Sequence, residues 1–137
     1  MIVELFVDIS AWYPRVVRSH PDHVRLSAAL RAHVERRVRI VTSDLIVVDS
    51  HTLIMRRAGI AAALRFVKLV RASSNVVVSS SPLLEDAAVT NWFMRDADQP
   101  FSMVDAVSFA IMAERGTRAA LTRDRHFATA GYEIVTD

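Results

Sequence analysis

Cysteine is absent from this chain of 137 residues, and glycine and proline are scarce, with three and four residues. The absence of cysteine excludes disulfide bonds and thiolate metal ligands, and it suits a reducing compartment. So few glycines and prolines argue against flexible linkers between domains. A chain of this length is typical of one domain, and we therefore expect a single domain over residues 1–137.

Long hydrophobic runs are also missing. No stretch of about 18 apolar residues occurs, so a membrane-spanning helix is not expected. The N-terminal segment MIVELFVDIS lacks a basic region, and Glu4 interrupts its apolar run, which is not the pattern of a signal peptide. Together with the lack of cysteine, these features predict a cytoplasmic protein.

Acidic residues are missing between Ser50 and Leu84. That stretch carries only basic charges, on Arg56, Arg57, Arg65, Lys68 and Arg71. Residues 15–39 likewise contain seven arginines but only two acidic residues, Asp22 and Glu35. One explanation is a polyanionic partner, and the alternative is that these are the solvated outer faces of helices.

Short apolar strands alternate with helical segments along the chain. We predict strands at residues 2–7, 39–43, 75–79, 118–122 and 132–136. Predicted helices cover residues 11–18, 22–37, 44–58, 60–72, 82–92 and 103–114. In the helix at 22–37 the predicted apolar side consists of Val24, Ala28, Leu30 and Val34. The alternation predicts a three-layer α/β/α sandwich with a mostly parallel central sheet, which binds ligands at the carboxyl ends of its strands.

Two carboxylates follow predicted strands. Asp8 comes directly after the first strand, and Asp124 lies two residues after the strand at 118–122. Both are therefore expected at the carboxyl edge of the sheet. Either residue by itself also fits a turn or a helix N-cap.

Two further carboxylates lie on helices among apolar residues. Asp49 shares a stripe with Leu45 and Leu53, and Asp105 shares one with Phe109, so both are predicted to point inward. A buried salt bridge or partial exposure is the alternative for Asp49. For Asp105 the alternative is a capping box with Ser102.

Convergence of these four carboxylates would place like charges close together. Such charges raise one another's pKa values and oppose folding unless a cation neutralises them. Oxygen ligands without cysteine or a histidine pair favour Mg²⁺ or Mn²⁺ over zinc. The sequence thus predicts a site suited to metal-assisted hydrolysis of a phosphodiester. Ser102 is a candidate hydrogen-bond partner of these carboxylates.

Three segments together resemble the PIN-domain nucleases, in particular the VapC-type toxins of bacterial toxin–antitoxin pairs. They are FVDISAW (6–12), TSDLIVVDSHTLIMRRAG (42–59) and FSMVDAVSFAIMAERGTRAALTRDRHF (101–127). The resemblance covers nearly the whole chain and keeps the order and spacing of the acidic motifs. It implies a PIN-like fold.

By this resemblance the catalytic residues are Asp8, Asp49, Asp105 and Asp124. Asp8, Asp105 and Asp124 are then the metal ligands, and Ser10 is the hydroxyl that follows the first of them. The chain departs from the family at Asp49, where a glutamate is usual. The shorter side chain implies contact through a bridging water, or weaker activity.

The resemblance further implies an Mg²⁺- or Mn²⁺-dependent endoribonuclease that acts as the toxin of a type II toxin–antitoxin system and inhibits translation. A transfer RNA and a ribosomal RNA are both open as targets. Implied partners are a cognate antitoxin, whose tail covers the acidic pocket, and a second copy in a homodimer.

Arg56 and Arg57 are candidate RNA contacts, because they end the helix that carries Asp49; they also suit the negative end of that helix. His126 is interpreted as structural, at the rim of the pocket.

Other enzyme classes are disfavoured, since no glycine-rich phosphate loop and no G-x-S-x-G elbow occur. The remaining rival is a PIN-like module that binds RNA or a protein without cutting, and the departure at Asp49 keeps it open.

Overall fold

The computed structural model describes residues 1–72 and 74–136, and its centre is a sheet with the strand order β3-β2-β1-β4-β5. All four pairs of neighbouring strands are parallel. The strands are β1 (Glu4–Val7), β2 (Arg39–Ser43), β3 (Asn75–Val78), β4 (Ala119–Leu121) and β5 (Glu133–Val135). Their carboxyl ends therefore share one edge of the sheet.

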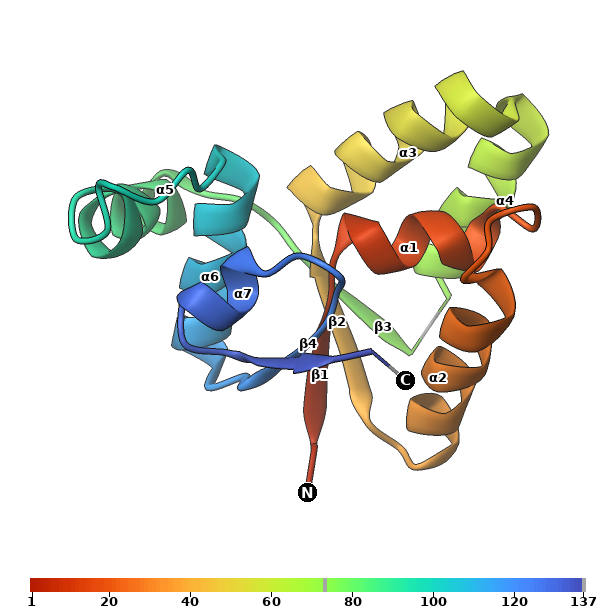
Figure 1. Ribbon diagram of the computed structural model, residues 1–137, viewed down its shortest axis with the longest axis horizontal. Coiled ribbons are helices and arrows are strands. Elements are labelled where there is room, and N and C mark those ends of the chain that lie inside the picture. The colour runs from red at the N-terminus through yellow and green to blue at the C-terminus, as the bar shows by residue number, and fades with distance from the viewer. Residues whose placement is uncertain (73, 137) are drawn as a thin grey trace.

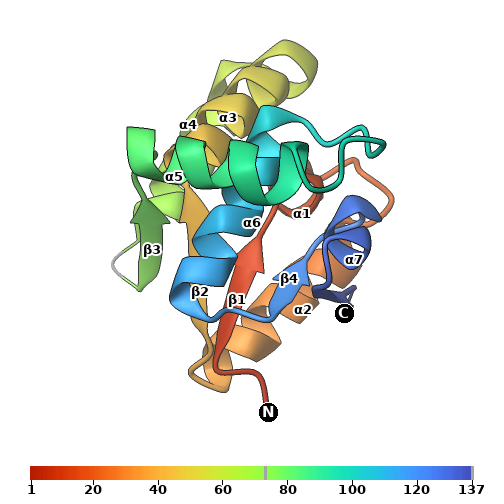
Figure 2. The ribbon, with the colours of Figure 1, turned by 90° about the vertical axis from the view of Figure 1, so that its left-hand side faces the viewer.

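Helices cover both faces of this sheet (Figures 1 and 2). One face carries α1 (Ile9–Val16), α2 (His23–Glu35) and α4 (Ile60–Val70). The other carries α5 (Pro82–Ala88), the π-helical turn η1 (Val89–Phe93), α6 (Met103–Arg115) and α7 (His126–Thr129). α3 (Asp44–Ala58) extends beyond the carboxyl edge and packs on α1 and α4. The predicted three-layer sandwich is confirmed.

Strand β1 lies in the middle of the sheet because both of its faces are apolar. Leu5, Phe6 and Val7 are almost completely buried, as expected for a parallel strand between two helical layers. Its backbone pairs with β2 on one side and with β4 on the other. The pairing continues for one residue past β1, where the N–H of Asp8 donates to the carbonyl of Leu121 at 3.2 Å. The ends of β1 and β4 are thereby held side by side.

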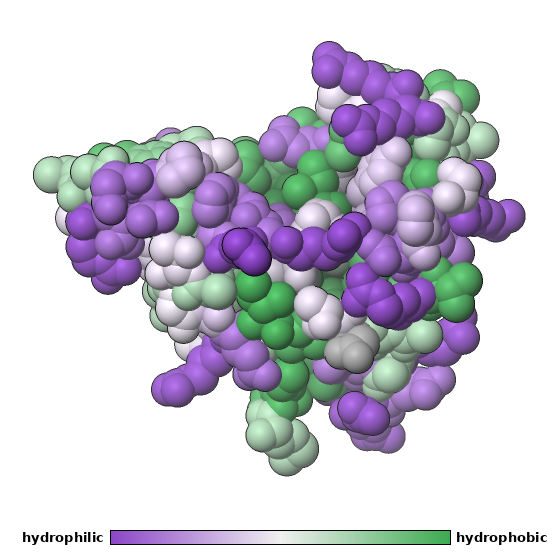
Figure 3. Space-filling model, viewed as in Figure 1, coloured by the Kyte–Doolittle hydropathy of each residue, from purple (hydrophilic) through white to green (hydrophobic). Residues whose placement is uncertain are grey.

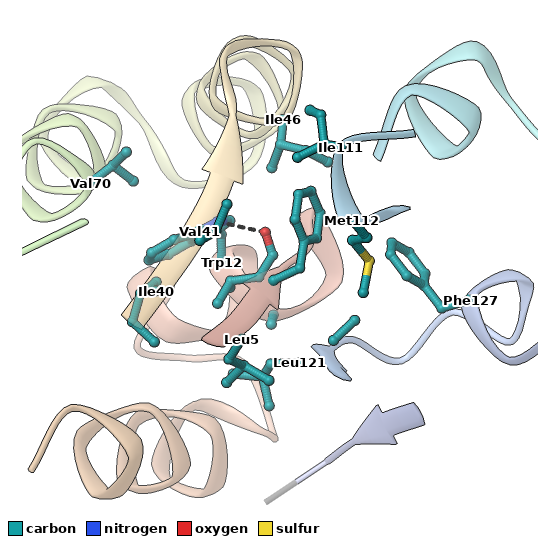
Figure 4. Packing of buried hydrophobic residues seen from close by; sticks show 14 of the residues in the cluster. Leu5, Trp12, Ile40, Val41, Ile46, Val70, Ile111, Met112, Leu121 and Phe127 are labelled. Carbon is teal, nitrogen blue, oxygen red and sulfur yellow. Dashed lines mark hydrogen bonds between the residues drawn. The ribbon is translucent and has the colours of Figure 1, made fainter. Parts of the chain in front are cut away.

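The core has an aromatic centre on each side of the sheet. On the α1 side, Trp12 packs edge-to-face on Phe66 with ring centroids 5.9 Å apart. Its indole N–H donates to the carbonyl of Val7 at 3.1 Å, and Figure 4 marks a hydrogen bond beside Trp12 with a dashed line. On the α6 side, one ring contacts four others: Phe109 packs on Trp92, Phe101, Phe127 and Tyr132. These contacts fix α1 and α6 against the sheet.

Helix α2 buries a different face from the predicted one. Val24 and Val34 are 77% and 45% exposed, and Ala28 is exposed as well. The buried residues are Leu26, Ala29, Leu30 and His33. At 3.6 residues per turn these four fall on one arc of about 100°, whereas the predicted set spreads over about 160° on a face that overlaps it only at Leu30. The prediction of the apolar face was therefore wrong except at Leu30.

Two segments between α5 and β5 also differ from the prediction. The helix predicted at 82–92 is α-helical only to Ala88 and continues as η1, where the N–H of Met94 donates to the carbonyl of Val89. Helix α7 was not predicted, since a single turn is too short to show a periodic pattern. No helix in the described part of the chain is long and apolar enough to cross a membrane.

Candidate metal centre

Asp8 lies at the centre of the carboxyl edge and is almost completely buried, with 2% of its surface exposed. It follows β1 directly and begins α1, whose Ala11 and Trp12 N–H groups donate to its carbonyl. Its carboxylate accepts hydrogen bonds from the hydroxyls of Thr122, at 3.0 Å, and Ser10, at 3.1 Å. No arginine or lysine pairs with Asp8 within residues 1–72 and 74–136.

Burial raises the pKa of the Asp8 carboxyl, and the negative charge of Asp105 raises it further. Hydrogen bonds from the backbone of Ile9 and from the side chains of Thr122 and Ser10 act in the opposite direction but do not cancel the effect. An ionised Asp8 is thus a buried charge without a cationic partner, which is the situation that a bound cation relieves.

Asp105 lies in the first turn of α6, where its side chain also caps the helix. The hydroxyl of Ser102 accepts from the N–H of Asp105 at 3.0 Å, and Asp105 Oδ2 accepts from the N–H of Ser102 at 3.2 Å. The capping box considered from the sequence is therefore present. The same carboxylate faces the end of β4, because Asp105 Oδ2 lies 3.1 Å from His126 Nδ1.

Asp124 follows β4, and His126 begins α7. The N–H of His126 donates to Asp124 Oδ1 at 2.9 Å, and the ring Nδ1 lies 3.4 Å from that same oxygen. One ligand atom from each of Asp105, Asp124 and His126 can be chosen so that all three lie within 4.8 Å of one another. The rings of Phe101 and His126 pack in a T-shaped contact, with centroids 5.4 Å apart.

Asp49 does not point inward as predicted. It is exposed, and the buried side of α3 consists of Ile46, Ser50 and Ile54, one position away from the predicted stripe. Asp49 has no hydrogen-bond or ion-pair partner among the described residues, and it is not one of the three ligands that converge. Of the four predicted carboxylates, Asp105 and Asp124 come together with His126, and Asp8 lies near enough for the charge of Asp105 to raise its pKa. Asp49 lies on the outer surface of α3.

Two participants were missed or undervalued from the sequence. Thr122, buried at the end of β4, bonds Asp8 and also accepts from the N–H of Asp124 at 3.0 Å. His126 was interpreted as structural, but it lies between two of the predicted ligands. The sequence did place both residues close to the predicted site, since Thr122 and His126 each lie two positions from Asp124. Ser10 and Ser102, which were predicted as supporting hydroxyls, do bond Asp8 and the backbone of Asp105.

The donors at this edge fit a hard divalent cation. Asp105 and Asp124 offer carboxylate oxygens that are only partly buried, and Asp8 brings a charge that lacks a counter-ion. Oxygen ligands of this kind suit Mg²⁺ or Mn²⁺. The imidazole of His126 adds one nitrogen donor, which Mn²⁺ tolerates better than Mg²⁺ does.

A hollow of about 320 Å³ opens beside Ser10. It is lined by Ile9, Ser10, Tyr13, Pro14, His20, Leu53 and Arg123. The guanidinium of Arg57 lies over the Tyr13 ring at 5.9 Å, so the end of α3 borders this hollow. Arg56 is exposed on the same helix end. Both arginines therefore lie at the surface on the α3 side of the site, where their predicted contact with RNA stays a prediction.

Comparison with known proteins finds no matching family model. A curated relative does match: the 23S rRNA-specific endonuclease VapC20 of Mycobacterium tuberculosis, found in two strains, is 29% identical over 128 residues. The alignment covers 93% of this chain and 95% of VapC20.

Solved structures agree with that match. The crystal structure of Mycobacterium tuberculosis VapC20, described as a sarcin–ricin loop cleaving toxin, superposes with a TM-score of 0.82 at 27% identity over 93% of this chain and 95% of that one. FitAcB from Neisseria gonorrhoeae superposes with a TM-score of 0.66 at 12% identity over 96% of both chains, which shows a shared fold alone. The resemblance to VapC-type PIN-domain proteins is confirmed.

Proposed function

We propose that this chain, a homologue of VapC20 with the fold of the VapC-type PIN domains, is a divalent-metal-dependent endoribonuclease and the toxin of a type II toxin–antitoxin pair. The observation that carries the proposal is the meeting of Asp105, Asp124 and His126 within 4.8 Å at the edge of the sheet where Asp8 is buried. In this arrangement the partly buried side chains of Asp105, Asp124 and His126 are accessible to solvent, whereas Asp8 is almost completely buried.

Asp105 and Asp124 would hold the metal, with Asp8 supplying the third carboxylate. When bound, Mg²⁺ or Mn²⁺ lowers the pKa of a coordinated water and offsets the negative charge of a phosphate. The protein side chains contribute orientation. Ser10 and Thr122 hold the Asp8 carboxylate in one position, and Ser102 fixes the backbone from which Asp105 projects.

The substrate that we propose is the sarcin–ricin loop of 23S ribosomal RNA, on the strength of the similarity to VapC20. Cleavage there would inhibit translation and would place the action of this protein in the cytoplasm. A transfer RNA, the other target considered from the sequence, has no support from the relatives.

A cognate antitoxin and a second copy of the chain are the proposed partners. Both proposals rest on the VapC resemblance. The exposed apolar residues on α3 and α4 offer area for such contacts; they are Val48, Met55, Ile60 and Leu64.

The test is cleavage of purified ribosomes and of naked 23S RNA with added Mg²⁺ or Mn²⁺. We expect one cut, which chelation abolishes. Asp105→Asn should lower its rate more than about a hundredfold, because a lost metal ligand removes several kcal/mol of charge stabilisation. The matched control is Asp86→Asn, which removes an exposed carboxylate from α5 and should cut like the wild type.

Two outcomes contradict the proposal. Cleavage that persists in Asp105→Asn would show that the acidic edge is not the active site. Tight RNA binding without cleavage of any cellular RNA would instead support the rival, a PIN-like binding module.

A further inference from the structure

A second concave site, remote from the acidic edge, carries only positive charge. It is a hollow of about 380 Å³, lined by Arg15, Val16, Arg18, His23, Arg65, Lys68 and Leu69. We call this set the basic pocket. Arg18, Arg65 and Lys68 are exposed, and none of the four lysine and arginine side chains forms a salt bridge with an acidic residue among the described parts of the chain.

The positive charges of the basic pocket lie close together without an acidic residue in its lining. Arg15 is half-buried, and both burial and the nearby positive charge of Arg31 lower its pKa. Some surface arginines are paired, since Arg115 binds Glu4 and both Arg25 and Arg123 bind Asp22. No acidic residue lines the basic pocket. A hollow that gathers several cations without acidic partners opposes folding slightly, and a polyanion would relieve that repulsion.

The basic pocket is connected to the acidic edge by one helix. α1 begins next to Asp8 and ends at Val16, and at 1.5 Å per residue its eight residues span about 12 Å. Figure 1 shows α1 running from the end of β1 toward α2 and α4. Figure 3, in the same orientation, shows many hydrophilic side chains on this right-hand part of the surface. A nucleic-acid strand cut at Asp8 can reach the pocket within a few nucleotides.

We propose that the basic pocket is a docking site for the RNA backbone, which binds phosphates a few nucleotides away from the bond that is cut. The inference rests on the proposed ribonuclease function, whose substrate it extends from one phosphodiester to a longer segment of RNA. An acidic protein segment is the competing occupant. RNA is favoured because α1 connects the two sites, so that an RNA strand bound at the acidic edge would extend toward the pocket. Nothing in the described structure directs a peptide there.

The test uses a binding variant in which Arg18→Gln, Arg65→Gln and Lys68→Gln are combined. Its matched control combines Arg36→Gln, Arg37→Gln and Arg118→Gln, three exposed arginines at the amino edge of the sheet. Both triple variants lose the same formal charge. Each is made in the Asp105→Asn background, so that binding to a labelled sarcin–ricin stem-loop RNA is measured without cleavage.

The expected result is a change in salt dependence. Each lost phosphate contact reduces the slope of log K against log salt by roughly 0.7 for single-stranded RNA, so the binding variant should lose about 2 from its slope and the control less than about 0.7. In the cleaving background, the binding variant should raise KM for the stem-loop and leave cleavage of a short oligonucleotide spanning only the acidic edge unchanged.

Equal salt slopes for the two triple variants would overturn the proposed docking site. RNA affinity of the binding variant equal to that of the parent would overturn it as well, and this is the result expected if an acidic protein segment were the occupant. Failure of the proposed function looks different. In that case the protein with intact Asp105 would cut neither RNA, while the salt slopes would still report on the pocket.

Discussion

At the scale of single residues, Asp8 combines a buried carboxylate with the lack of any basic partner in the described structure. Burial raises its pKa, so the ionised form that a metal requires is the form that the folded protein tolerates poorly. Only the hydroxyls of Ser10 and Thr122 and the backbone at Ile9 offset this. Function and stability therefore conflict at this position.

The first prediction follows from that conflict. In a chelating buffer near pH 7, Asp8→Asn should raise the Tm by a few degrees, because it removes a charge whose ionisation disfavours the folded state. Since the folded-state pKa is raised, the wild type recovers this stability as the pH falls through that pKa, and the advantage of the variant should shrink there. Thermal melts across a pH series test this.

Added Mg²⁺ provides the control for Asp8→Asn. The ion should raise the Tm of the wild type more than that of the variant, since binding to the folded state adds stability. A variant that melts at or below the wild-type temperature at neutral pH would contradict the interpretation of Asp8.

Thr122 supplies a second prediction at this scale. Thr122→Val keeps the shape of the side chain but removes the hydrogen bond to Asp8 and the acceptor for the N–H of Asp124. Loss of such a supporting bond typically costs 10- to 100-fold in metal affinity or activity, and we expect a loss of about that size. Mn²⁺ titration and cleavage rates measure it. Thr129→Val, at an exposed position in α7, is the matched control and should change neither quantity.

At the scale of elements, strand ends were predictable from the sequence and helix faces were less so. The strand at 39–43 agrees with β2 at both ends, and the apolar run before Asp8 is β1. The prediction that Asp49 points inward was wrong. α1 and α4 cover only one side of α3, and the stripe of α3 that carries Asp49 lies next to that side and is open to solvent. Single-residue shifts of this kind depend on tertiary packing, which periodicity does not contain.

The N-terminus of α6 joins capping with the site, and it provides a third prediction. Ser102→Ala removes the acceptor for the N–H of Asp105 and should cost about 1 kcal/mol of unfolding free energy. Because the backbone of Asp105 then loses its hydrogen bond to the Ser102 hydroxyl, the cleavage rate should fall as well. Denaturant unfolding and single-turnover cleavage are the two measurements.

Ser81 is the matched control, since its hydroxyl caps α5 by accepting from the N–H of Leu84 at 3.2 Å. Ser81→Ala should lose similar stability with no change in cleavage rate. Equal rates for Ser102→Ala and Ser81→Ala would show that the cap of α6 does not orient Asp105.

At the scale of the whole molecule, the two buried tryptophans report on opposite sides of the sheet. Trp12 lies in the α1 layer against Phe66, and Trp92 lies in the η1 turn against Phe109. The single domain predicted over residues 1–137 requires that both layers unfold together.

This gives a fourth prediction. Trp12→Phe and Trp92→Phe each leave one tryptophan, and in each variant the fluorescence transition in urea should coincide with the loss of helix seen by circular dichroism. Separate midpoints for fluorescence and dichroism within one variant would instead indicate two units that unfold independently. Comparison within a variant removes the effect of the substitution itself.

The order of the strands has a consequence for biosynthesis. β1 is made first but is completed only when β4, which begins at Ala119, pairs beside it, and Asp124 follows still later. A nascent chain that stops before β4 therefore lacks Asp124, a proposed metal ligand, and the hydroxyl of Thr122 that bonds Asp8. Under the proposed function, a nascent chain that has not yet reached Asp124 would not cut the ribosomal RNA of the ribosome that is making it.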